Sequence, residues 1–481
     1  MSRLLKTIIT ALFVAGVSML PVMAGQAKPN IVIIINDDMG YADIGCFGAP
    51  KIKTPRIDQM AKEGRRFTNF YMAASVCSPS RAALMTGSYP QRVGVEHVIF
   101  PDSGHGLDPS HFTLAELLKS AGYATLAPGK WHLGDQAKYL PTNQGFDSFY
   151  GIPYSNDMGP AKNMKYADDC TFREGLSLEK LAEAFLQSKG KKRVLGGKVP
   201  LMRDEECIEF PLDQTTITRR LTDEGISFIE KSVNEDKPFF LYLANPMPHI
   251  PLYVSPEFEG KSAGGKYGDV IEEIDFNTGR ILDALKKNGV AENTLVIFTS
   301  DNGPWLIMRD RCGSAKPFRD GKGSSYEGGQ RVPCVMRWPD MIPRGTESAE
   351  LATAMDLLPT FSEMTGVALP PELKPDGHSM LKLMTGDPEG KTSYAAFYFG
   401  HRKNNSAVRC KNWKYRKGPR NGVWSGIKTK DNPSVEQLFD LAKDPGETTN
   451  LIKQYPEVAE RLKSSYHSFR LYLSDDRPWR L

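Results

Sequence analysis

Three short, strongly apolar runs constrain the fold of this 481-residue chain more than any other feature. The runs are NIVIIIN at 30–36, FFLYLA at 239–244 and TLVIFT at 294–299. Nearly continuous apolar runs, rich in β-branched and aromatic residues, are typical of strands that are buried on both faces of a sheet. Segments with helical periodicity lie between them, at 55–63, 113–120 and 270–287. Strands that alternate with helices predict an α/β fold with a large, mostly parallel sheet flanked by helices.

The pattern changes toward the C-terminus. From about residue 380 the strand-like segments are short and carry no motif of catalytic chemistry, and a helical segment follows them; they are 395–399, 407–415 and 456–469. A chain of 481 residues exceeds one ordinary hydrophobic core. We therefore expect a catalytic domain at 25–380 and a smaller α+β domain, built on a short antiparallel sheet, at 381–481. Residues 160–215 are charged and contain glycine, which predicts an irregular insertion near the site.

The N-terminus has the features of a secretory signal peptide. Arg3 and Lys6 precede an apolar run at 8–20, and small residues that suit cleavage follow at 22–24. The run is short for a membrane span, which needs about 20 apolar residues. Removal of residues 1–24 is therefore predicted to leave a secreted or periplasmic protein without a membrane span. A lysosomal location is less expected, because only one glycosylation sequon is present, at Asn404.

The charge balance excludes two classes of partner. The formal net charge is only +4 over 481 residues. Binding to nucleic acid or to an anionic membrane surface depends on a marked excess of Lys and Arg. We therefore expect no nucleic-acid partner.

Acidic side chains follow two of the three apolar runs. Asp37 and Asp38 come directly after the first run, and Asp301 and Asn302 come directly after the third. Ligands of open α/β sheets gather beyond the carboxyl ends of the strands, so these side chains are expected to meet there. Several carboxylates at one point repel each other unless a cation neutralises them, and oxygen ligands favour Ca²⁺ or Mg²⁺. The alternative is a pair of helix-capping aspartates, which are common at such turns.

Other motifs place reactive side chain types in loops that follow strands. Cys77 stands in CSPSR, His132 in PGKWHLG, His249 in PMPHIP and Lys322 in DGKG. Histidines in loops at the carboxyl ends of strands suit acid–base catalysis, and a lysine flanked by glycines can approach an anionic group closely. Each also has an ordinary structural reading: a buried cysteine, two structural histidines and a flexible surface turn.

Together these motifs resemble those of a known family. The segments that match, in family order, are NDDMGYADIGCFG, CSPSRAALMTG, GKWHLG, GIPYSNDMGP, TSDNGP, GKGSSYEGG and QLFDLAKDPGETTNL. From residue 29 to about residue 455 the chain resembles the formylglycine-dependent sulfatases of the arylsulfatase type, within the alkaline phosphatase superfamily. The resemblance implies an enzyme that hydrolyses a sulfate ester, and a maturation enzyme that oxidises Cys77 to formylglycine.

The resemblance also implies roles for the site residues. Asp37, Asp38, Asp301 and Asn302, together with the modified Cys77, would hold a divalent cation, normally Ca²⁺. Arg81 and Lys130 would steady the formylglycine, and His132 would act on the second hydroxyl of the hydrated aldehyde. His249 and Lys322 would face the sulfate and the leaving oxygen. Ser155 would help to hold the sulfate.

The motifs do not identify the natural substrate. The chain departs from the arylsulfatase A pattern in 160–215 and after Gly303, where the leaving group would sit. We expect a sulfated saccharide, because an exported enzyme meets sulfated polysaccharides, and His97, Trp305 and His401 are loop residues that could contact the sugar. Two alternatives stay open: a phosphonate or phosphodiester hydrolase of the same superfamily, and an inactive protein that binds sulfated glycans.

Seven cysteines are an odd number for an exported chain, which indicates one thiol with a separate role. If Cys77 is modified, six remain, and an oxidising compartment allows pairs among them. Cys170 and Cys207 flank part of the insertion and are the pair that we expect first.

Overall fold

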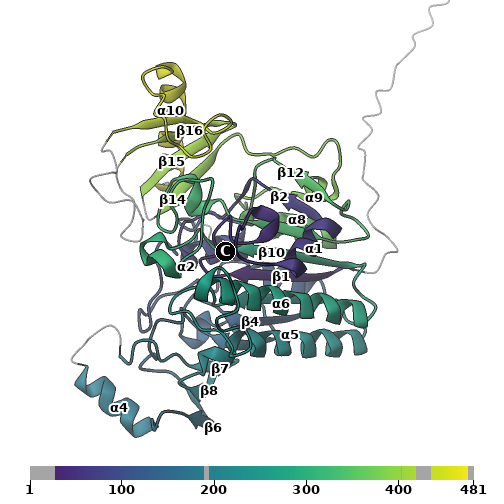
Figure 1. Ribbon diagram of the computed structural model, residues 1–481, viewed down its shortest axis with the longest axis vertical. Helices are drawn as coiled ribbons and strands as arrows, with labels where there is room; N and C mark the ends of the chain where they lie inside the picture. The colour runs from purple at the N-terminus through teal and green to yellow at the C-terminus, as the bar shows by residue number, and fades with distance from the viewer. Residues whose placement is uncertain (1–27, 189–193, 402–403, 419–434, 475–481) are drawn as a thin grey trace, which may run out of the picture.

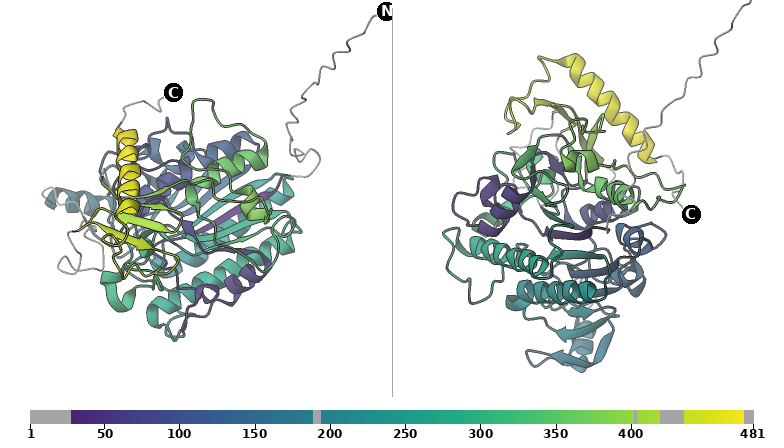
Figure 2. Two further views of the ribbon diagram at one scale, coloured as in Figure 1. Left: turned by 90° about the horizontal axis from the view of Figure 1, so that it is seen from above. Right: turned by 90° about the vertical axis from the view of Figure 1, so that its right-hand side faces the viewer.

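The computed structural model describes residues 28–188, 194–401, 404–418 and 435–474. A large sheet runs through the middle of the molecule, with helices on both sides (Figures 1 and 2). Eleven of the described strands form it, in the order β12-β2-β11-β10-β1-β9-β4-β5-β7-β8-β6. The predicted signal peptide at 1–24 lies outside the described residues.

The centre of the sheet consists of the predicted apolar strands and their neighbours, all parallel. These strands are β10 (Thr294–Ser300), β1 (Asn30–Asn36), β9 (Phe239–Asn245), β4 (Ala124–Lys130) and β5 (Ser148–Ile152). Every residue of β1, β9 and β10 is buried, as the apolar runs predict. Because the strands are parallel, their carboxyl ends meet at one edge, where the loops that follow them converge.

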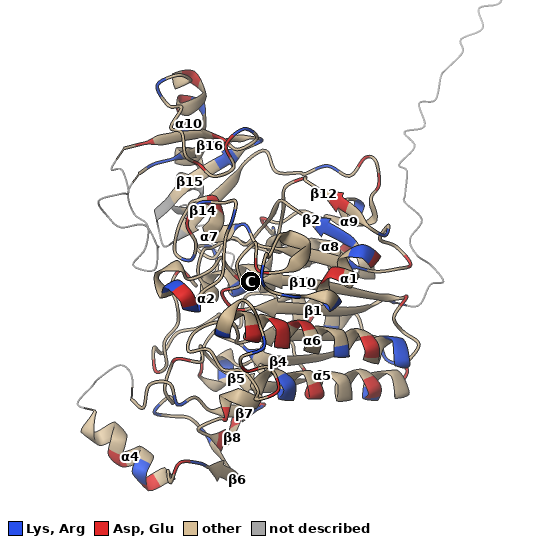
Figure 3. Ribbon diagram, in the orientation of Figure 1, with Lys and Arg blue, Asp and Glu red and all other residues tan. Residues whose placement is uncertain are grey.

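The two faces of this sheet pack against separate hydrophobic cores. Ile31, Ile33 and Ile35 of β1 point into one core, and Val32 and Ile34 point into the other, as alternation along a strand requires. The first core also receives α2 (Cys77–Thr86), α3 (Leu114–Ser120) and α8 (Leu357–Thr365). The second receives α1 (Pro55–Glu63), α5 (Ile217–Asn234) and α6 (Gly265–Lys287), whose outer faces carry charged residues (Figure 3).

The edges of the sheet depart from the parallel pattern. One edge is formed by β11 (Cys334–Arg337), β2 (Arg65–Phe67) and β12 (Thr346–Ser348). The other is formed by β7 (Leu201–Arg203), β8 (Glu206–Phe210) and β6 (Tyr166–Phe172). These last strands and α4 (Leu178–Gln187) belong to the insertion at 160–215, so the expectation of an irregular segment was wrong. The strands were missed because an edge strand such as YADDCTF is partly exposed and lacks a strong apolar pattern.

A second, antiparallel sheet follows near the C-terminus, as predicted. It contains β14 (Phe397–His401), β15 (Asn404–Cys410), β16 (Trp413–Arg416) and β17 (Gln437–Asp440), and α10 (Pro456–Ser474) packs on its outer face. The segment predicted at 407–415 is two strands, because the chain turns at Lys411, where φ is 53°. The structure thus confirms the predicted fold class.

Short elements connect these layers. They are β3 (Phe70–Tyr71), β13 (Ala352–Thr353), α7 (Glu327–Gln330), α9 (Leu381–Thr385) and the 3₁₀ turns Gly45–Phe47, Ala137–Tyr139, Pro141–Asn143, Gln214–Thr216, Leu306–Arg311 and Ala354–Asp356. Within the described ranges, the helices are all too short or too polar to cross a membrane.

The seven cysteines are free thiols in this structure, so the expected pair of Cys170 and Cys207 is not bonded. The two residues nevertheless pack in one small hydrophobic cluster, on the paired strands β6 and β8.

Candidate active site

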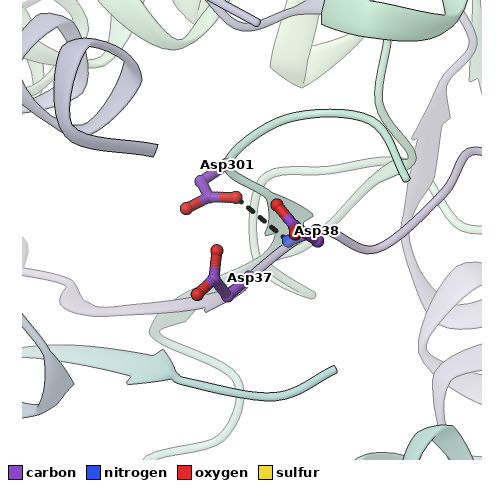
Figure 4. A group of neighbouring side chains, drawn as sticks. All are labelled: Asp37, Asp38 and Asp301. Atoms are coloured by element: carbon purple, nitrogen blue, oxygen red, sulfur yellow. Dashed lines mark hydrogen bonds between the residues drawn. The ribbon is translucent and has the colours of Figure 1, made fainter. Parts of the chain in front are cut away.

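Three buried aspartates meet at the carboxyl ends of β1 and β10. The two strands are paired up to Asn36 and Ser300, so Asp37 and Asp301 leave the sheet side by side. Oxygen atoms of Asp37, Asp38 and Asp301 lie within 4.8 Å of one another (Figure 4). The structure therefore brings the two acidic motifs together, as their positions after parallel strands predict.

Backbone hydrogen bonds and the side chain of Asn302 hold the three aspartates in place. Asp38 has a φ of 65°, and its backbone N–H donates to Asp301 Oδ1 at 3.2 Å. Asn302 Nδ2 donates to Asp38 Oδ1 at 2.7 Å. Among the described residues, Asp37 Oδ1 and Asn302 Oδ1 find no hydrogen-bond donor although both are buried. Buried oxygens without donors are costly, and oxygen donors of this kind suit a hard divalent cation, so the residues present fit such an ion.

Each aspartate also has its own cationic side chain. Lys130 Nζ pairs with Asp37, Lys322 Nζ lies 2.7 Å from Asp38 Oδ1, and Arg81 Nε lies 2.9 Å from Asp301 Oδ2. Burial acts to raise the pKa of Asp37, but the charges of Lys130, His249 and Lys322 hold that pKa well below its ordinary value. Burial and the charge of Asp37 raise the pKa of Asp301. Three carboxylates and three cations balance, so a bound divalent cation would leave surplus positive charge, which favours an anionic ligand.

Cys77 is the first residue of α2 and is 2% exposed. Arg81 lies one helical turn further on, on the same side of α2, and its Nη1 donates to the backbone carbonyl of Lys130 at 2.6 Å. Burial raises the pKa of the Cys77 thiol, although Lys130 and Lys322 lower it in part. The thiol therefore stays protonated near neutral pH and is a poor nucleophile as it stands.

One ring nitrogen of His132 has no partner among the described residues. His132 follows the end of β4, in which Gly129 has a φ of 121° and a Cβ would lie 1.9 Å from the carbonyl oxygen of Ala244 on β9. His132 Nε2 lies 2.9 Å from the carbonyl oxygen of Ile99, which can only accept, so Nε2 carries the proton. Its Nδ1 is buried without a partner among the described residues, with its lone pair available. Burial and the charge of Lys130 lower the pKa of His132 far enough to keep the ring neutral.

His249 has the opposite tautomer. Its Nδ1 lies 3.0 Å from Asn156 Oδ1 and 2.6 Å from the carbonyl oxygen of Ile250, so Nδ1 donates. Its Nε2 therefore faces the aspartates, 3.7 Å from Asp38 Oδ2. Ser155 Oγ lies 3.3 Å from the His249 ring and 3.4 Å from Lys130 Nζ, so it joins the two sides of the site. Asn156 was not predicted as a site residue, although it directly follows Ser155 in GIPYSNDMGP.

The three candidate substrate-contact residues differ in position. The centroid of the Trp305 ring lies 5.4 Å from that of the His249 ring and 4.8 Å from Lys322 Nζ, and its Nε1 is a buried donor without an acceptor in the described chain. His97 is exposed, in the loop that contains Ile99. His401 ends β14, but its side chain lies outside what the structure describes. The structure thus brings Trp305 to the site.

Comparison with known proteins gives two family matches. The family model "Sulfatase" matches residues 29–367, and the model "N-sulphoglucosamine sulphohydrolase, C-terminal" matches residues 320–471. These matches overlap across Lys322 and together cover nearly all of the described chain.

Curated relatives and solved structures agree with these models. Arylsulfatase A of Homo sapiens is 36% identical over 462 residues, which cover 92% of this chain and 87% of the relative. N-acetylgalactosamine-6-sulfatase of Sus scrofa is 34% identical, with coverage of 94% and 87%. The crystal structure of Ps i-CgsB in complex with k-i-k-neocarrahexaose has a TM-score of 0.75 and 31% identity, with coverage of 92% and 93%. The chain therefore belongs to the sulfatase family and is a sulfuric ester hydrolase.

Proposed function

We propose that the protein is an exported sulfatase that removes sulfate from a sulfated carbohydrate, with a formylglycine made from Cys77 as the nucleophile and a Ca²⁺ ion in the site. The observation that supports this most is the buried group of Asp37, Asp38 and Asp301, which has unpartnered oxygens and lies among cationic side chains. Asn302 and the modified residue 77 would complete the cation's ligands.

Two groups would supply what the unmodified chain lacks. The hydrated aldehyde would supply one hydroxyl that can attack sulfur and a second hydroxyl whose deprotonation lets the aldehyde form again. The cation would supply positive charge next to the attacking hydroxyl and the sulfate oxygens. Arg81 and Lys130, which contact each other and two of the aspartates, would fix this end of the site.

The remaining residues would hold the sulfate and move protons. Lys130, Lys322 and Ser155 would balance the charge of the sulfate oxygens throughout the reaction. His249 Nε2 faces the site because Nδ1 is held by Asn156 and Ile250. In the doubly protonated ring, Nε2–H would give its proton to the departing sugar oxygen, which leaves the ring with its proton on Nδ1. The free Nδ1 of His132 would accept the proton of the second hydroxyl.

The names of the relatives support a carbohydrate substrate. One relative is named for a sulfated amino sugar, and one solved structure is in complex with a neocarrahexaose. The apolar run that precedes the described residues supports export to the periplasm or the medium. We also propose the division into residues 25–380 and 381–481 as the domain organisation.

The experiment that tests this function has two parts. The mass of the peptide that contains residue 77, from protein made in its natural host, should show the aldehyde in place of the thiol. The same protein should release sulfate from an aryl sulfate and from sulfated saccharides more rapidly than it hydrolyses a phosphodiester or phosphonate analogue. An intact thiol together with undiminished sulfate release would exclude the formylglycine. Binding of sulfated glycans without sulfate release, after co-expression with a maturation enzyme, would favour the inactive alternative.

A further inference from the structure

The loop at 319–330 brings Lys322 into the site and ends in α7. On its inner side, Lys322 Nζ lies 2.7 Å from Asp38 Oδ1. The backbone N–H of Gly303 donates to the carbonyl of Gly329 at 3.1 Å, and a Cβ on Gly303 would lie 1.8 Å from a carbonyl oxygen of the loop. The backbone of this loop thus packs directly on the segment that follows Asn302, so neither can shift without the other.

The outer side of the same loop contacts the inner face of the C-terminal sheet through Lys414 and Arg416, and α7 is drawn next to β14 in Figure 3. Strand β16 reads WKYR, and alternation points Lys414 and Arg416 to one face and Tyr415 to the other. Tyr415 packs with Leu462 and Tyr466 of α10. Lys414 and Arg416 are both buried against the loop.

Lys414 joins the sheet to α7 through a buried ion cluster. Its Nζ lies 2.9 Å from Glu327 Oε1 and 3.0 Å from Glu447 Oε1, and all three side chains are inaccessible to solvent. Glu447 also accepts a hydrogen bond from the backbone N–H of Glu327 at 2.6 Å. Lys414 Nζ lies 3.8 Å from the centre of the Phe399 ring, which closes the cluster on the sheet side.

Arg416 contacts the loop closer to Lys322. Its Nε donates to Ser325 Oγ at 3.0 Å, and its guanidinium lies 4.2 Å from the centre of the Tyr326 ring. The Tyr326 hydroxyl in turn donates to Gln437 Oε1 of β17 at 2.9 Å. Ser325 and Tyr326 follow Lys322 by only three and four residues.

Burying this many charges costs desolvation free energy, so a gain in stability does not explain why the chain has this ion cluster. The desolvation of buried ion pairs commonly cancels their attraction, and well-packed apolar residues often serve as well. A buried cluster does specify one arrangement, because a shift of Glu327 would separate opposite charges that are out of contact with water. Catalysis depends on such precision, since a displacement of about 1 Å can cost about 100-fold in rate.

We propose that Lys414 and Arg416 are positioning residues, which hold the 319–330 loop so that the ammonium of Lys322 faces the sulfate. This inference rests on the proposed function, because it takes Lys322 to contact the sulfate. It assigns to Lys414 and Arg416 of the C-terminal sheet an indirect part in catalysis, through the 319–330 loop.

A mutant cycle tests the inference with an aryl sulfate, whose good leaving group keeps slow variants measurable. Lys414→Met and Arg416→Met are each made with Lys322 intact and in the Lys322→Ala enzyme, and kcat, KM and the formylglycine content are measured. Since residues that act through a shared partner are not additive, each is expected to lower kcat about 10-fold with Lys322 present and less than about 2-fold without it. Arg416→Met leaves the ion cluster intact, so it serves if Lys414→Met does not fold.

The matched control is Leu438→Ala, on the outer face of the same sheet, where Leu438 packs with Tyr415 and α10. It should lower the melting temperature as much as the test variants and leave kcat within about 2-fold. Equal losses of kcat in the presence and absence of Lys322, or a loss of kcat in Leu438→Ala that matches its loss of stability, would overturn the inference. If Lys322→Ala itself keeps full activity, the role proposed for Lys322 fails instead.

Discussion

The two histidines of the site differ in which ring nitrogen carries the proton. His132 donates from Nε2 to the carbonyl of Ile99, and His249 donates from Nδ1 to Asn156 and Ile250. Their free nitrogens are thus fixed by partners outside the reaction rather than by the substrate. This arrangement gives each histidine one direction in which it can exchange a proton.

His132→Ala is expected to slow the second half of the reaction more than the first. Without the free Nδ1, no base takes the proton that must leave before sulfate is expelled, while attack on the ester continues. Rapid mixing with an aryl sulfate should show a burst of about one phenol per active site, with later turnover slower by about 100-fold. Added imidazole should restore part of the later turnover. A uniform decrease of both phases would contradict the role of His132.

Trp305→Phe separates the two features of Trp305. Phenylalanine keeps a ring against His249 and Lys322 but removes the buried Nε1–H, which has no acceptor in the described chain. If a sugar hydroxyl is that acceptor, kcat/KM for a sulfated oligosaccharide should fall about 5- to 10-fold, and kcat/KM for an aryl sulfate should change little. Trp305→Ala, which removes the ring as well, should affect both substrates. Equal effects of Trp305→Phe on both would exclude the hydrogen bond.

At the scale of elements, the central strands could be predicted and the edges could not. Strands buried on both faces have to be apolar throughout, so 30–36, 239–244 and 294–299 were visible in the sequence. The acidic motifs at their ends could likewise be placed together, because parallel strands end at one edge. Edge strands such as β6 need only a partial apolar face, so their pattern is weak.

The inner face of β16 could not be predicted for a different reason. Lys414 and Arg416 alternate with Trp413 and Tyr415, which is the pattern of a strand whose charged face meets water. Lys414 is buried against acids more than 30 residues away in the chain, such as Glu447, and Arg416 is buried against Ser325 and Tyr326. Partners that are this distant leave no local signal.

The insertion offers a prediction at the same scale. Cys170 and Cys207 pack in one cluster on adjacent strands, so an exported protein exposed to an oxidant such as a periplasmic dithiol oxidase should form the disulfide, with loss of two electrons and two protons. Peptide mapping without reduction should show the two peptides linked in protein from the periplasm and separate in protein from a reducing cytoplasm. Cys46 lies elsewhere in the fold and should be alkylated in both samples once the chain is unfolded in denaturant. Unlinked peptides from the oxidised sample would contradict the pairing.

At the scale of the whole molecule, buried carboxyl groups set how stability depends on pH. Burial raises the pKa of Asp43 and Asp356 to about 6 and that of Asp275 to about 7. A carboxyl whose pKa is raised by folding keeps its proton longer in the folded chain, so its contribution to stability is lost as pH rises from about 4 through the folded pKa. Glu327 acts in the opposite sense: Lys414 holds its pKa below the ordinary value despite burial, so its contribution is lost toward acid.

The melting temperature should therefore be highest near pH 5 and several degrees lower at pH 8, measured with Ca²⁺ present throughout. Asp275→Asn is the control, because it retains an acceptor for the backbone N–H of Ile57 at the start of α1 but cannot titrate. The difference between pH 5 and pH 8 should be smaller in this variant. A melting temperature that rises from pH 5 to pH 8 in the unmodified protein would contradict the assignment of these pKa values.

The burial of Cys77 has a consequence for the order of events in biosynthesis. Once α2 is packed, its ten residues are inaccessible, and Cys77 is buried near Asp37, Lys130 and Asp301, which come from distant parts of the chain. A separate enzyme cannot bind a segment in that position. The oxidation proposed for Cys77 must then take place on the newly made chain, before β10 joins the sheet. Molecules that fold before Cys77 is oxidised would be well formed and permanently inactive. The yield of active enzyme therefore depends on the rate of maturation relative to the rate of folding.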